Sequence, residues 1–241
     1  VLLLLAEGRT NKKSNVADIY TLDIEDASEL RASVLKSRIS HCNAKNTHAS
    51  MKWTSLFLSD KSYNSLNKAL EYKNLTSIGD FADVDVGVVT GRNSFFVLEE
   101  SQAKLLGVLK HTLPVVGRTS ALQSIEFNSG DFKEYKKKHP AFMLDLKNID
   151  KNKFSDGLKK YIKLGEKEKV HEGYKCSVRK RWYDVPSIYI SDGFFFRQIH
   201  NYPMLVANDA KAAATDTIHR VRMKNGIRVK ELAANTFNSF T

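Results

Sequence analysis

Short apolar runs separated by polar turns are the feature that most constrains the fold of this chain. The run 204–207 and the alternating stretches 84–88 and 217–223 have the length and period of β-strands. No apolar run approaches the roughly 18 residues that a membrane-spanning helix needs. Hydrophobic residues make up 42% of the 241 residues, which is enough to bury a core. The pattern therefore predicts an α+β fold with many short strands and packed helices.

The same patterns predict where each element lies. Apolar runs and two-residue alternation predict strands at residues 1–5, 16–22, 84–88, 115–118, 141–146, 187–190, 204–207 and 217–223. Apolar residues at helical spacing predict helices at residues 26–36, 60–72, 99–110, 155–169 and 229–237. Gly91 lies between two strand-like runs, which predicts a hairpin turn at residues 90–94. The core candidates near residue 55 are Trp53, Leu56 and Phe57.

Chain length, the first residues and the cysteines bear on organisation and location. A chain of 241 residues has the size of one large domain or two small ones. It begins inside an expected buried strand and without an initiator Met, so we expect an excised piece of a longer protein. Cys42 and Cys176 form neither a disulfide framework nor a zinc site, which favours a reducing, cytoplasmic location.

Positive charge is concentrated in the second half of the chain. The formal net charge is +11. Residues 1–130 hold 15 basic and 14 acidic side chains, whereas residues 131–241 hold 23 basic and 13 acidic ones. This asymmetry indicates a polyanionic partner for the second half, although a basic surface without a specific ligand has the same composition.

The residue patterns of self-contained catalysis are missing from the sequence. None of the four prolines belongs to an Asn-Pro-Pro-aromatic tetrad. The sequence has no Gly-rich phosphate or dinucleotide loop, no Gly-x-Ser-x-Gly and no His-Glu-x-x-His. Asp83 and Asp85 share one strand face, which is more often solvated than cation-binding. We therefore predict no catalytic, cofactor-binding or metal-binding residue in this chain.

A segment rich in basic and aromatic residues, 174–182, carries the strongest chemical pattern. It reads Tyr-Lys-Cys-Ser-Val-Arg-Lys-Arg-Trp, and the wider stretch 151–182 holds 11 basic and 4 acidic side chains. Cations neutralise phosphates and aromatic planes pack on sugars or bases, so this interleaving is typical of nucleic-acid contacts. The alternative is that Trp182 lies in the core and the lysines form a solvated helix face. The two interpretations are compatible.

Two turns also place Gly beside Arg. They are residues 90–93, Thr-Gly-Arg-Asn, and residues 117–120, Gly-Arg-Thr-Ser. Loop Arg and Asn side chains are suited to reading groove edges, because Arg pairs with guanine and Asn with adenine. Each turn by itself is also compatible with an ordinary surface turn.

Several blocks of the second region occur together and in a fixed order. They are Val86–Phe96, Trp182–Pro186, Asp192–Phe195, Tyr202–Asn208, Ala214–Val221 and Asn238–Ser239. Over roughly residues 75–241 this order resembles the C-terminal part of N6-adenine DNA methyltransferases of restriction–modification systems. The TaqI-like subgroup is the most similar type. A pattern of several blocks is more specific than any one motif.

The resemblance implies the sequence-reading part of an enzyme whose chemistry lies elsewhere. Such enzymes flip the target adenine out of the duplex and transfer a methyl group from S-adenosylmethionine to N6. Their Asn/Asp-Pro-Pro-Tyr tetrad and Gly-rich cofactor motif are both absent here. Residues 1–58 would then be the truncated tail of an α/β methyltransferase domain, and residues 59–241 the DNA target-recognition domain. S-adenosylmethionine would bind the parent enzyme and not this chain.

The resemblance also implies partners and residue roles. Double-stranded DNA is the expected partner, restriction-system subunits are a second class that the resemblance allows, and no membrane contact is expected. The expected phosphate contacts are Lys175, Arg179, Lys180 and Arg181. The side chains expected to approach base edges are Arg92, Asn93 and Arg118. Structural or phosphate-contacting roles are expected for Asn208, Thr215, His219 and Arg220.

Two other classes of function are compatible with the basic composition. An RNA-binding module of a modification enzyme would stack bases on aromatic side chains of an exposed sheet face, and Phe194, Phe195 and Phe196 are the candidates. A basic structural protein on anionic membranes would need an amphipathic basic helix, for which residues 155–169 are the candidate. The apolar face of that segment is narrow.

Overall fold

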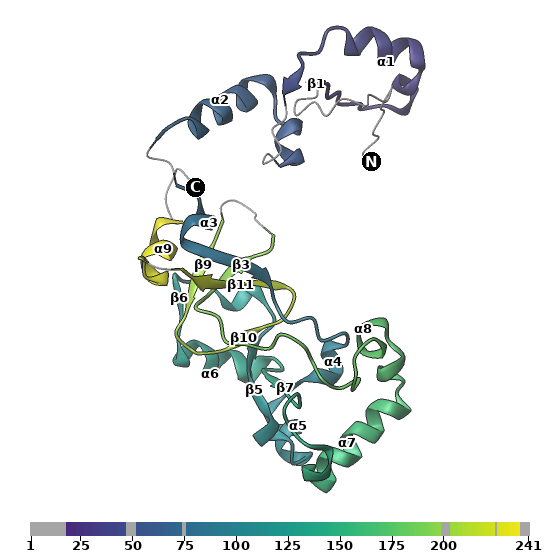
Figure 1. Cartoon of the computed structure of the whole chain (residues 1–241), viewed down its shortest axis with the longest axis vertical. Coiled ribbons are helices and arrows are strands. Elements are labelled where there is room, and N and C mark those ends of the chain that lie inside the picture. The colour runs from purple at the N-terminus through teal and green to yellow at the C-terminus, as the bar shows by residue number, and fades with distance from the viewer. Residues whose placement is uncertain (1–17, 47–51, 74–75, 199–202, 225, 237–241) are drawn as a thin grey trace. The chain divides into compact units, whose positions relative to one another are not determined.

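The computed structural model describes residues 18–46, 52–73, 76–198, 203–224 and 226–236 (Figure 1). The chain divides into two compact units, Val1–Thr76 and Ser77–Thr241, which are described separately. The expected domain boundary between residues 58 and 59 stays a prediction. The expected strand at residues 1–5 and the block Asn238–Ser239 lie outside the described residues. No described helix combines the length and apolar character that crossing a bilayer requires.

The first unit is built from short elements. Strands β1 (Asp18–Ile19) and β2 (Lys45–Asn46) pair antiparallel. The helices are α1 (Ala32–Ile39), α2 (Asp60–Leu70) and the 3-10 helices Ala27–Leu30 and Trp53–Phe57. The helix expected at residues 26–36 is divided, because the extended backbone of Arg31 separates the first 3-10 helix from α1.

Only one of the three expected core residues of this unit is buried. Leu56 is buried, whereas Trp53 and Phe57 are more than half exposed. The carbonyl of Leu56 accepts a hydrogen bond from Lys45 Nζ at 2.7 Å, and Lys45 is itself buried. The expectation for Trp53 and Phe57 was therefore wrong for the described unit, because the 3-10 helix turns only Leu56 inward.

Two mixed sheets form the centre of the second unit. The five-stranded sheet has the order β3-β11-β8-β9-β6, and the four-stranded sheet has the order β10-β5-β7-β4. Their strands are β3 (Ala82–Val86), β4 (Val97–Leu98), β5 (Thr112–Val116), β6 (Glu126–Phe127), β7 (Phe142–Leu144), β8 (Gly193–Phe196), β9 (Leu205–Asn208), β10 (Ala213–Ala214) and β11 (Ile218–Met223). The expected mixed α+β fold with many short strands is confirmed.

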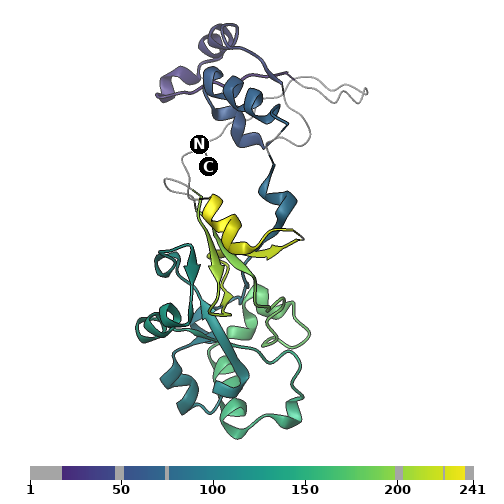
Figure 2. The same ribbon diagram turned by 90° about the vertical axis from the view of Figure 1, so that its left-hand side faces the viewer.

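Helices surround both sheets of this unit. They are α3 (Ile78–Phe81), α4 (Asn93–Phe96), α5 (Glu100–Leu105), α6 (Ser129–Lys138), α7 (Asp156–Lys167), α8 (Tyr174–Ser177) and α9 (Val229–Asn235). Shorter 3-10 helices lie at Leu109–His111, Thr119–Ala121, Lys151–Lys153 and Val170–Glu172. Figure 2 shows α9 against the strands of the five-stranded sheet, where it packs on β9.

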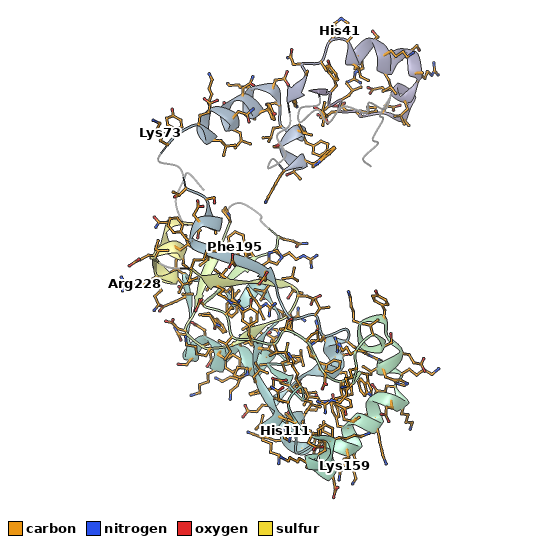
Figure 3. The ribbon with its side chains drawn as sticks, viewed as in Figure 1. His41, Lys73, His111, Lys159, Phe195 and Arg228 are labelled. Carbon is orange, nitrogen blue, oxygen red and sulfur yellow. The ribbon has the colours of Figure 1, made fainter. Side chains whose placement is uncertain are left out.

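Three apolar clusters hold these layers together. The largest joins the four-stranded sheet to α4, α7 and α8. A second includes Phe127 and Phe194, and a third lies beneath α9 around Leu205 and Val221. Phe195, labelled in Figure 3, packs against the third cluster. Successive residues of β8 therefore face different clusters, as strand alternation requires.

The expected hairpin at residues 90–94 was wrong. β3 belongs to the five-stranded sheet and β4 to the four-stranded sheet, so the two strands do not pair. Residues 93–96 form the helical turn α4, which buries both Phe95 and Phe96. The Phe95 ring stacks on Tyr161 with centroids 4.5 Å apart. Consecutive rings of a strand would point to opposite faces, so burial of both in one core favours the helical turn.

The strand expected at residues 187–190 was wrong, and the helix expected at residues 99–110 was wrong at its C-terminal end. Residues 187–190 form no strand: Ser187 has φ of +56°, and Tyr189 packs against arginine side chains. The helix expected at residues 99–110 stops at Leu105, because Gly107 adopts φ of +66° and ends it. The helix expected at residues 155–169 is confirmed as α7, capped by the Ser155 hydroxyl.

Candidate nucleic-acid interface

Three loops meet around Thr215, where the chain passes from β10 to β11. The Val88 N–H donates to the Ala214 carbonyl at 2.7 Å, and the Thr217 hydroxyl donates to the Gly117 carbonyl at 2.8 Å. Thr215 lies between these bonds and is buried. The loops that follow β3 and β5 are thereby fixed to the same turn.

A glycine allows the first of these loops to approach so closely. A Cβ on Gly87 would lie 1.9 Å from the carbonyl oxygen of Thr215, which no side chain tolerates. The Thr215 and Thr217 hydroxyl oxygens are 2.9 Å apart and share a hydrogen bond. The backbone of Gly87 therefore lies directly against the backbone of the turn 214–217, and the hydrogen bond between the two threonine hydroxyls lies within that turn.

The same loop packs against α8 on its other side. Arg179 Nη2 donates to the carbonyls of Thr90 at 2.8 Å and Val89 at 3.1 Å. Gly91 has φ of +89°, and a Cβ on it would lie 3.0 Å from the Cβ of Lys175. Figure 1 shows α4 beside α8 on the side of this unit where α7 also lies. The turn 90–93 and the basic segment, predicted separately, are therefore in contact.

We call residues 87–93, 117–120, 174–180 and 214–217 the loop cluster. These residues include five basic side chains and one acidic side chain. The exposed cations among them are Arg92, Arg118, Lys175 and Lys180. The loop cluster brings together most of the predicted site residues and gives them a net positive charge, which suits a polyanion.

The predicted base-reading residues keep much of their donor capacity. Arg92 is exposed and uses Nη1 on the Glu168 carbonyl at 3.0 Å. Exposed Asn93 accepts a hydrogen bond from the Thr90 hydroxyl at 2.6 Å through Oδ1. Arg118 is exposed, and its guanidinium has no hydrogen bond or ion pair within the described ranges. All three side chains can therefore present donors outward.

The two lysines of the segment differ from its two arginines. Lys175 and Lys180 are exposed and form no ion pair with a described acidic residue. Burial lowers the pKa of Arg179, whose guanidinium also lies 5.6 Å from the Phe96 ring centroid. The lysines are free to meet an outside anion, whereas Arg179 fastens α8 to the loop after β3.

Arg181 is also occupied inside the molecule. Its Nε and Nη2 donate to the two carboxylate oxygens of Asp184 at 2.7 and 2.9 Å. The hydrogen bonds with Asp184 raise the pKa of Arg181. Nη1 also donates to the Ile149 carbonyl at 2.8 Å. The phosphate contacts expected for Arg179 and Arg181 stay predictions, and the contacts observed for both position the segment.

Asn208 and Arg220 lie in the interior and hold backbone groups. Asn208 Nδ2 donates to the carbonyls of Ser191 and Ala212, each at 2.8 Å. Arg220 Nε donates to the Val86 carbonyl at 3.0 Å, immediately before the loop after β3. Both side chains hold backbone groups in place, and the roles expected for them stay predictions.

His219 lies on β11 next to Arg220 and is half-buried. Burial is the main cause that lowers its pKa, and the charge of Arg197 lowers it further. His219 pairs with Phe195 of β8 and Val86 of β3 across the sheet. It is therefore a side chain of the second strand of this sheet, with β3 at the edge beside it.

A row of lysines on α7, expected from the sequence to be a solvated or membrane-facing helix face, was not among the predicted DNA contacts. Lys160, Lys163 and Lys167 share one helix face, opposite the buried Tyr161 and Ile162. They form no ion pair with a described acidic residue, whereas neighbouring Lys159, labelled in Figure 3, pairs with Asp156 at 3.4 Å. Their spacing of three and four residues was the pattern that could have identified them.

Residues 50–241 match the family of the C-terminal domain of Type II methyltransferase M.Eco57I. The chain belongs to this family. A curated relative, Type II methyltransferase M.AccI of Acinetobacter calcoaceticus, is 27% identical over 146 residues. These cover 59% of the chain and 25% of the relative, so the aligned part spans a quarter of that protein's length. The resemblance to the C-terminal part of a restriction–modification methyltransferase is thereby confirmed.

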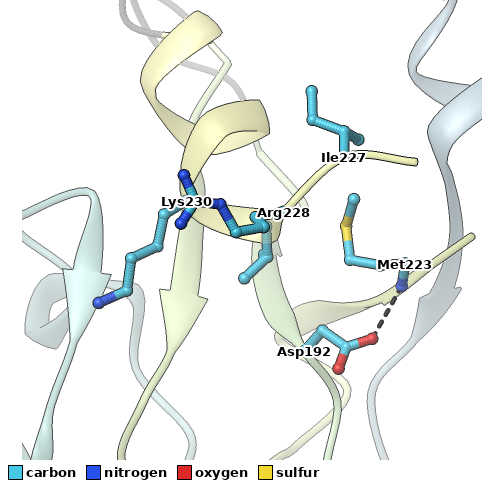
Figure 4. Close-up of a pocket in the computed structure, with 6 residues that line it drawn as sticks. Asp192, Met223, Ile227, Arg228 and Lys230 are labelled. Atoms are coloured by element: carbon cyan, nitrogen blue, oxygen red, sulfur yellow. Dashed lines mark hydrogen bonds between the residues drawn. The ribbon is translucent and has the colours of Figure 1, made fainter. Parts of the chain in front are cut away.

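The match to the M.Eco57I C-terminal family includes every segment of the loop cluster. A hollow of about 570 Å³ lies elsewhere, beside α9, and is lined by residues including Asp192, Met223 and Lys230 (Figure 4). Its carboxylate is already engaged, because Asp192 accepts a hydrogen bond from the Met223 N–H at 2.8 Å. None of the predicted site residues lines this hollow.

Proposed function

We propose that this chain is the DNA target-recognition region of an adenine-specific DNA methyltransferase of a restriction–modification system. The observation that carries the proposal is the loop cluster itself. Loops from both sheets and the basic segment 174–182 are joined by direct contacts, and the loop cluster carries exposed Arg, Asn and Lys side chains. The chain also belongs to a methyltransferase C-terminal family.

Duplex DNA is the polyanion that these side chains suit best. Lys175 and Lys180 neutralise phosphates, and the row Lys160, Lys163 and Lys167 on α7 adds further phosphate contacts. Arg92, Asn93 and Arg118 approach base edges in the major groove. Arg donates two hydrogen bonds to guanine, and Asn donates and accepts one each with adenine.

The methyl-transfer chemistry belongs to the parent enzyme. The catalytic Asn/Asp-Pro-Pro-Tyr tetrad and the Gly-rich cofactor motif are absent from this sequence. We therefore place S-adenosylmethionine and the flipped adenine in the parent's catalytic domain and assign this chain to binding. Arg179, Arg181, Asn208 and Arg220 act as positioning residues, because each holds backbone carbonyls of the same unit.

The RNA-binding alternative has less support. A base-stacking sheet would need exposed aromatic rings on one face of β8. Phe194 is buried, while Phe195 and Phe196 pack against two different apolar clusters. The rings of this strand therefore contribute to the cores and offer no platform for successive bases.

Selection from a random duplex library tests the proposal. We expect the chain to enrich one sequence, and Arg118→Ala to relax preference at one base pair by about 1–3 kcal/mol. Arg228→Ala is the charge-matched control, because Arg228 lies beside α9 and pairs with Glu231 (Figure 3). Enrichment of no sequence, or the same loss in both variants, would contradict the assignment.

A further inference from the structure

Helix α8 and its C-cap residue expose two apolar side chains within the loop cluster. Tyr174 is 75% exposed and Val178 is 66% exposed. They are four residues apart on a helical turn and so share one face. Between them, Cys176 points inward and is buried. Single exposed apolar residues are common, but an adjacent pair on a positively charged surface calls for a ligand that is both anionic and apolar.

The backbone under this pair is held firmly. The Cys176 N–H donates to the Gly173 carbonyl at 2.8 Å, and the Cys176 thiol faces the Thr90 carbonyl at 3.9 Å. Arg179, next to Val178, donates to the same Thr90 carbonyl at 2.8 Å. Tyr174 and Val178 are therefore presented by an anchored element, so their ordering on binding costs little conformational entropy.

The surroundings of the pair identify the chemistry of its partner. Lys175 Nζ lies 5.4 Å from the centroid of the Tyr174 ring, and exposed Lys180 follows Val178 by two residues. An apolar protein surface would leave these ammonium groups without counter-charges. A nucleic acid supplies both components, because phosphates meet the lysines while base faces meet the apolar side chains.

We propose that Tyr174 and Val178 form an apolar wedge that contacts the faces of bases in duplex DNA. This inference rests on the proposed DNA recognition by the loop cluster and extends it. The lysines hold the phosphates on either side, and the Tyr174 ring packs against a base step and partly unstacks it. Contacts of this kind do not depend on counterion release, so they add affinity without changing its salt dependence.

The test uses the 241-residue chain and the duplex that library selection enriches, with 2-aminopurine placed at successive positions. We expect Tyr174→Ala to weaken binding about 5- to 150-fold, which corresponds to 1–3 kcal/mol for one stacked base. It should leave the salt slope unchanged. The unmodified chain should raise 2-aminopurine fluorescence by unstacking the base step, and Tyr174→Ala should abolish this rise. Tyr174→Phe should retain both the affinity and the fluorescence. Because Tyr174 is exposed, an unchanged unfolding midpoint establishes that each variant is folded.

Lys175→Gln is the matched comparison on the next residue. It should reduce the magnitude of the salt slope by about 0.9 and keep the fluorescence rise, because only a phosphate contact is lost. Wild-type affinity and fluorescence in Tyr174→Ala would overturn the wedge and leave DNA recognition intact. Absence of salt-dependent duplex binding by the unmodified chain would overturn both proposals.

Discussion

The guanidinium of Arg220 lies 4.0 Å from the centroid of the Tyr189 ring, and Arg220 is only 5% exposed. Its Nε donates to the Val86 carbonyl and its Nη1 to the Ser187 carbonyl. Burial lowers the pKa of Arg220, and the nearby Asp85 carboxylate partly offsets this effect. The Arg220 side chain thus joins β11, the end of β3 and the irregular segment 187–190. Its contact on β3 is with Val86, the residue before the first loop of the loop cluster.

Removing this side chain should destabilise the second unit. We expect Arg220→Ala to lower the free energy of unfolding by about 1.5–3 kcal/mol, because the carbonyls of Val86 and Ser187 lose a charged donor. Arg222→Ala is the control. Its guanidinium lies 4.5 Å from the same ring but is exposed, so the loss should be about 0.5–1 kcal/mol. Urea unfolding measures both, and equal losses would contradict the role of Arg220.

Gly91 should be intolerant of a side chain for two reasons. Gly91→Ala forces φ of +89° on a residue with a Cβ, at a cost of about 1–3 kcal/mol, and presses that Cβ against Lys175 and Cys176. Gly107→Ala has φ of +66° but no atom within 4 Å of its Cβ, so it carries the backbone cost alone. We expect a larger loss of unfolding free energy for Gly91→Ala.

The DNA affinities of these two glycine variants separate stability from recognition. Gly91→Ala should weaken duplex binding, because the loop and α8 are displaced together. Gly107→Ala should bind duplex DNA as the unmodified chain does at a temperature where both are folded. Titration of a labelled duplex measures this, and equal affinities of the two variants would show that contact between loop and helix is not needed for binding.

Arg179 and Lys180 are adjacent but should respond differently to substitution. Arg179→Ala should lower the free energy of unfolding by about 1–3 kcal/mol, because the Val89 and Thr90 carbonyls lose their donor. Lys180→Ala should leave unfolding unchanged and reduce the magnitude of the salt slope of duplex binding by about 0.9. A loss of stability in Lys180→Ala with an unchanged slope would reverse these roles.

Stability should decrease in mild acid through His111 and His219. Burial lowers the pKa of both below the ordinary value of 6.5, and the charges of Lys110 and Arg197 add to the effect. The folded chain therefore binds fewer protons than the unfolded chain below pH 6.5. The contribution of these two histidines to the free energy of unfolding should be fully present above pH 6.5. It should be lost as pH falls through their folded-state pKa values. His219→Gln should reduce this dependence, as measured by unfolding at pH 7.5 and 5.5, and an undiminished dependence would contradict it.

The local sequence was sufficient to predict an element where the spacing of its apolar side chains determined that element. Leu158, Tyr161 and Ile162 at helical spacing after Ser155 predicted α7, and alternation predicted β11. The pattern failed at residues 187–190. There the Arg220 guanidinium, and not a neighbouring strand, donates to the Ser187 carbonyl and packs on the Tyr189 ring. Such a contact joins residues more than 30 positions apart, which no local period records.

The candidate site was predictable in parts and not as a whole. Gly-Arg turns and the basic segment were each visible in the sequence, but their contact depends on Gly87, Gly91 and Thr215. The division of roles within the segment was also not visible. Arg179 and Lys180 have the same charge and are adjacent, yet only the fold turns one toward backbone carbonyls and the other toward solvent.

The salt dependence of duplex binding tests the central proposal most directly. About five phosphate contacts from the loop cluster and α7 predict a slope of log affinity against log salt concentration near −4 to −5. The affinity for single-stranded RNA of the same length should be lower. A slope near zero, or equal affinity for the RNA, would contradict the assignment of this chain to DNA target recognition.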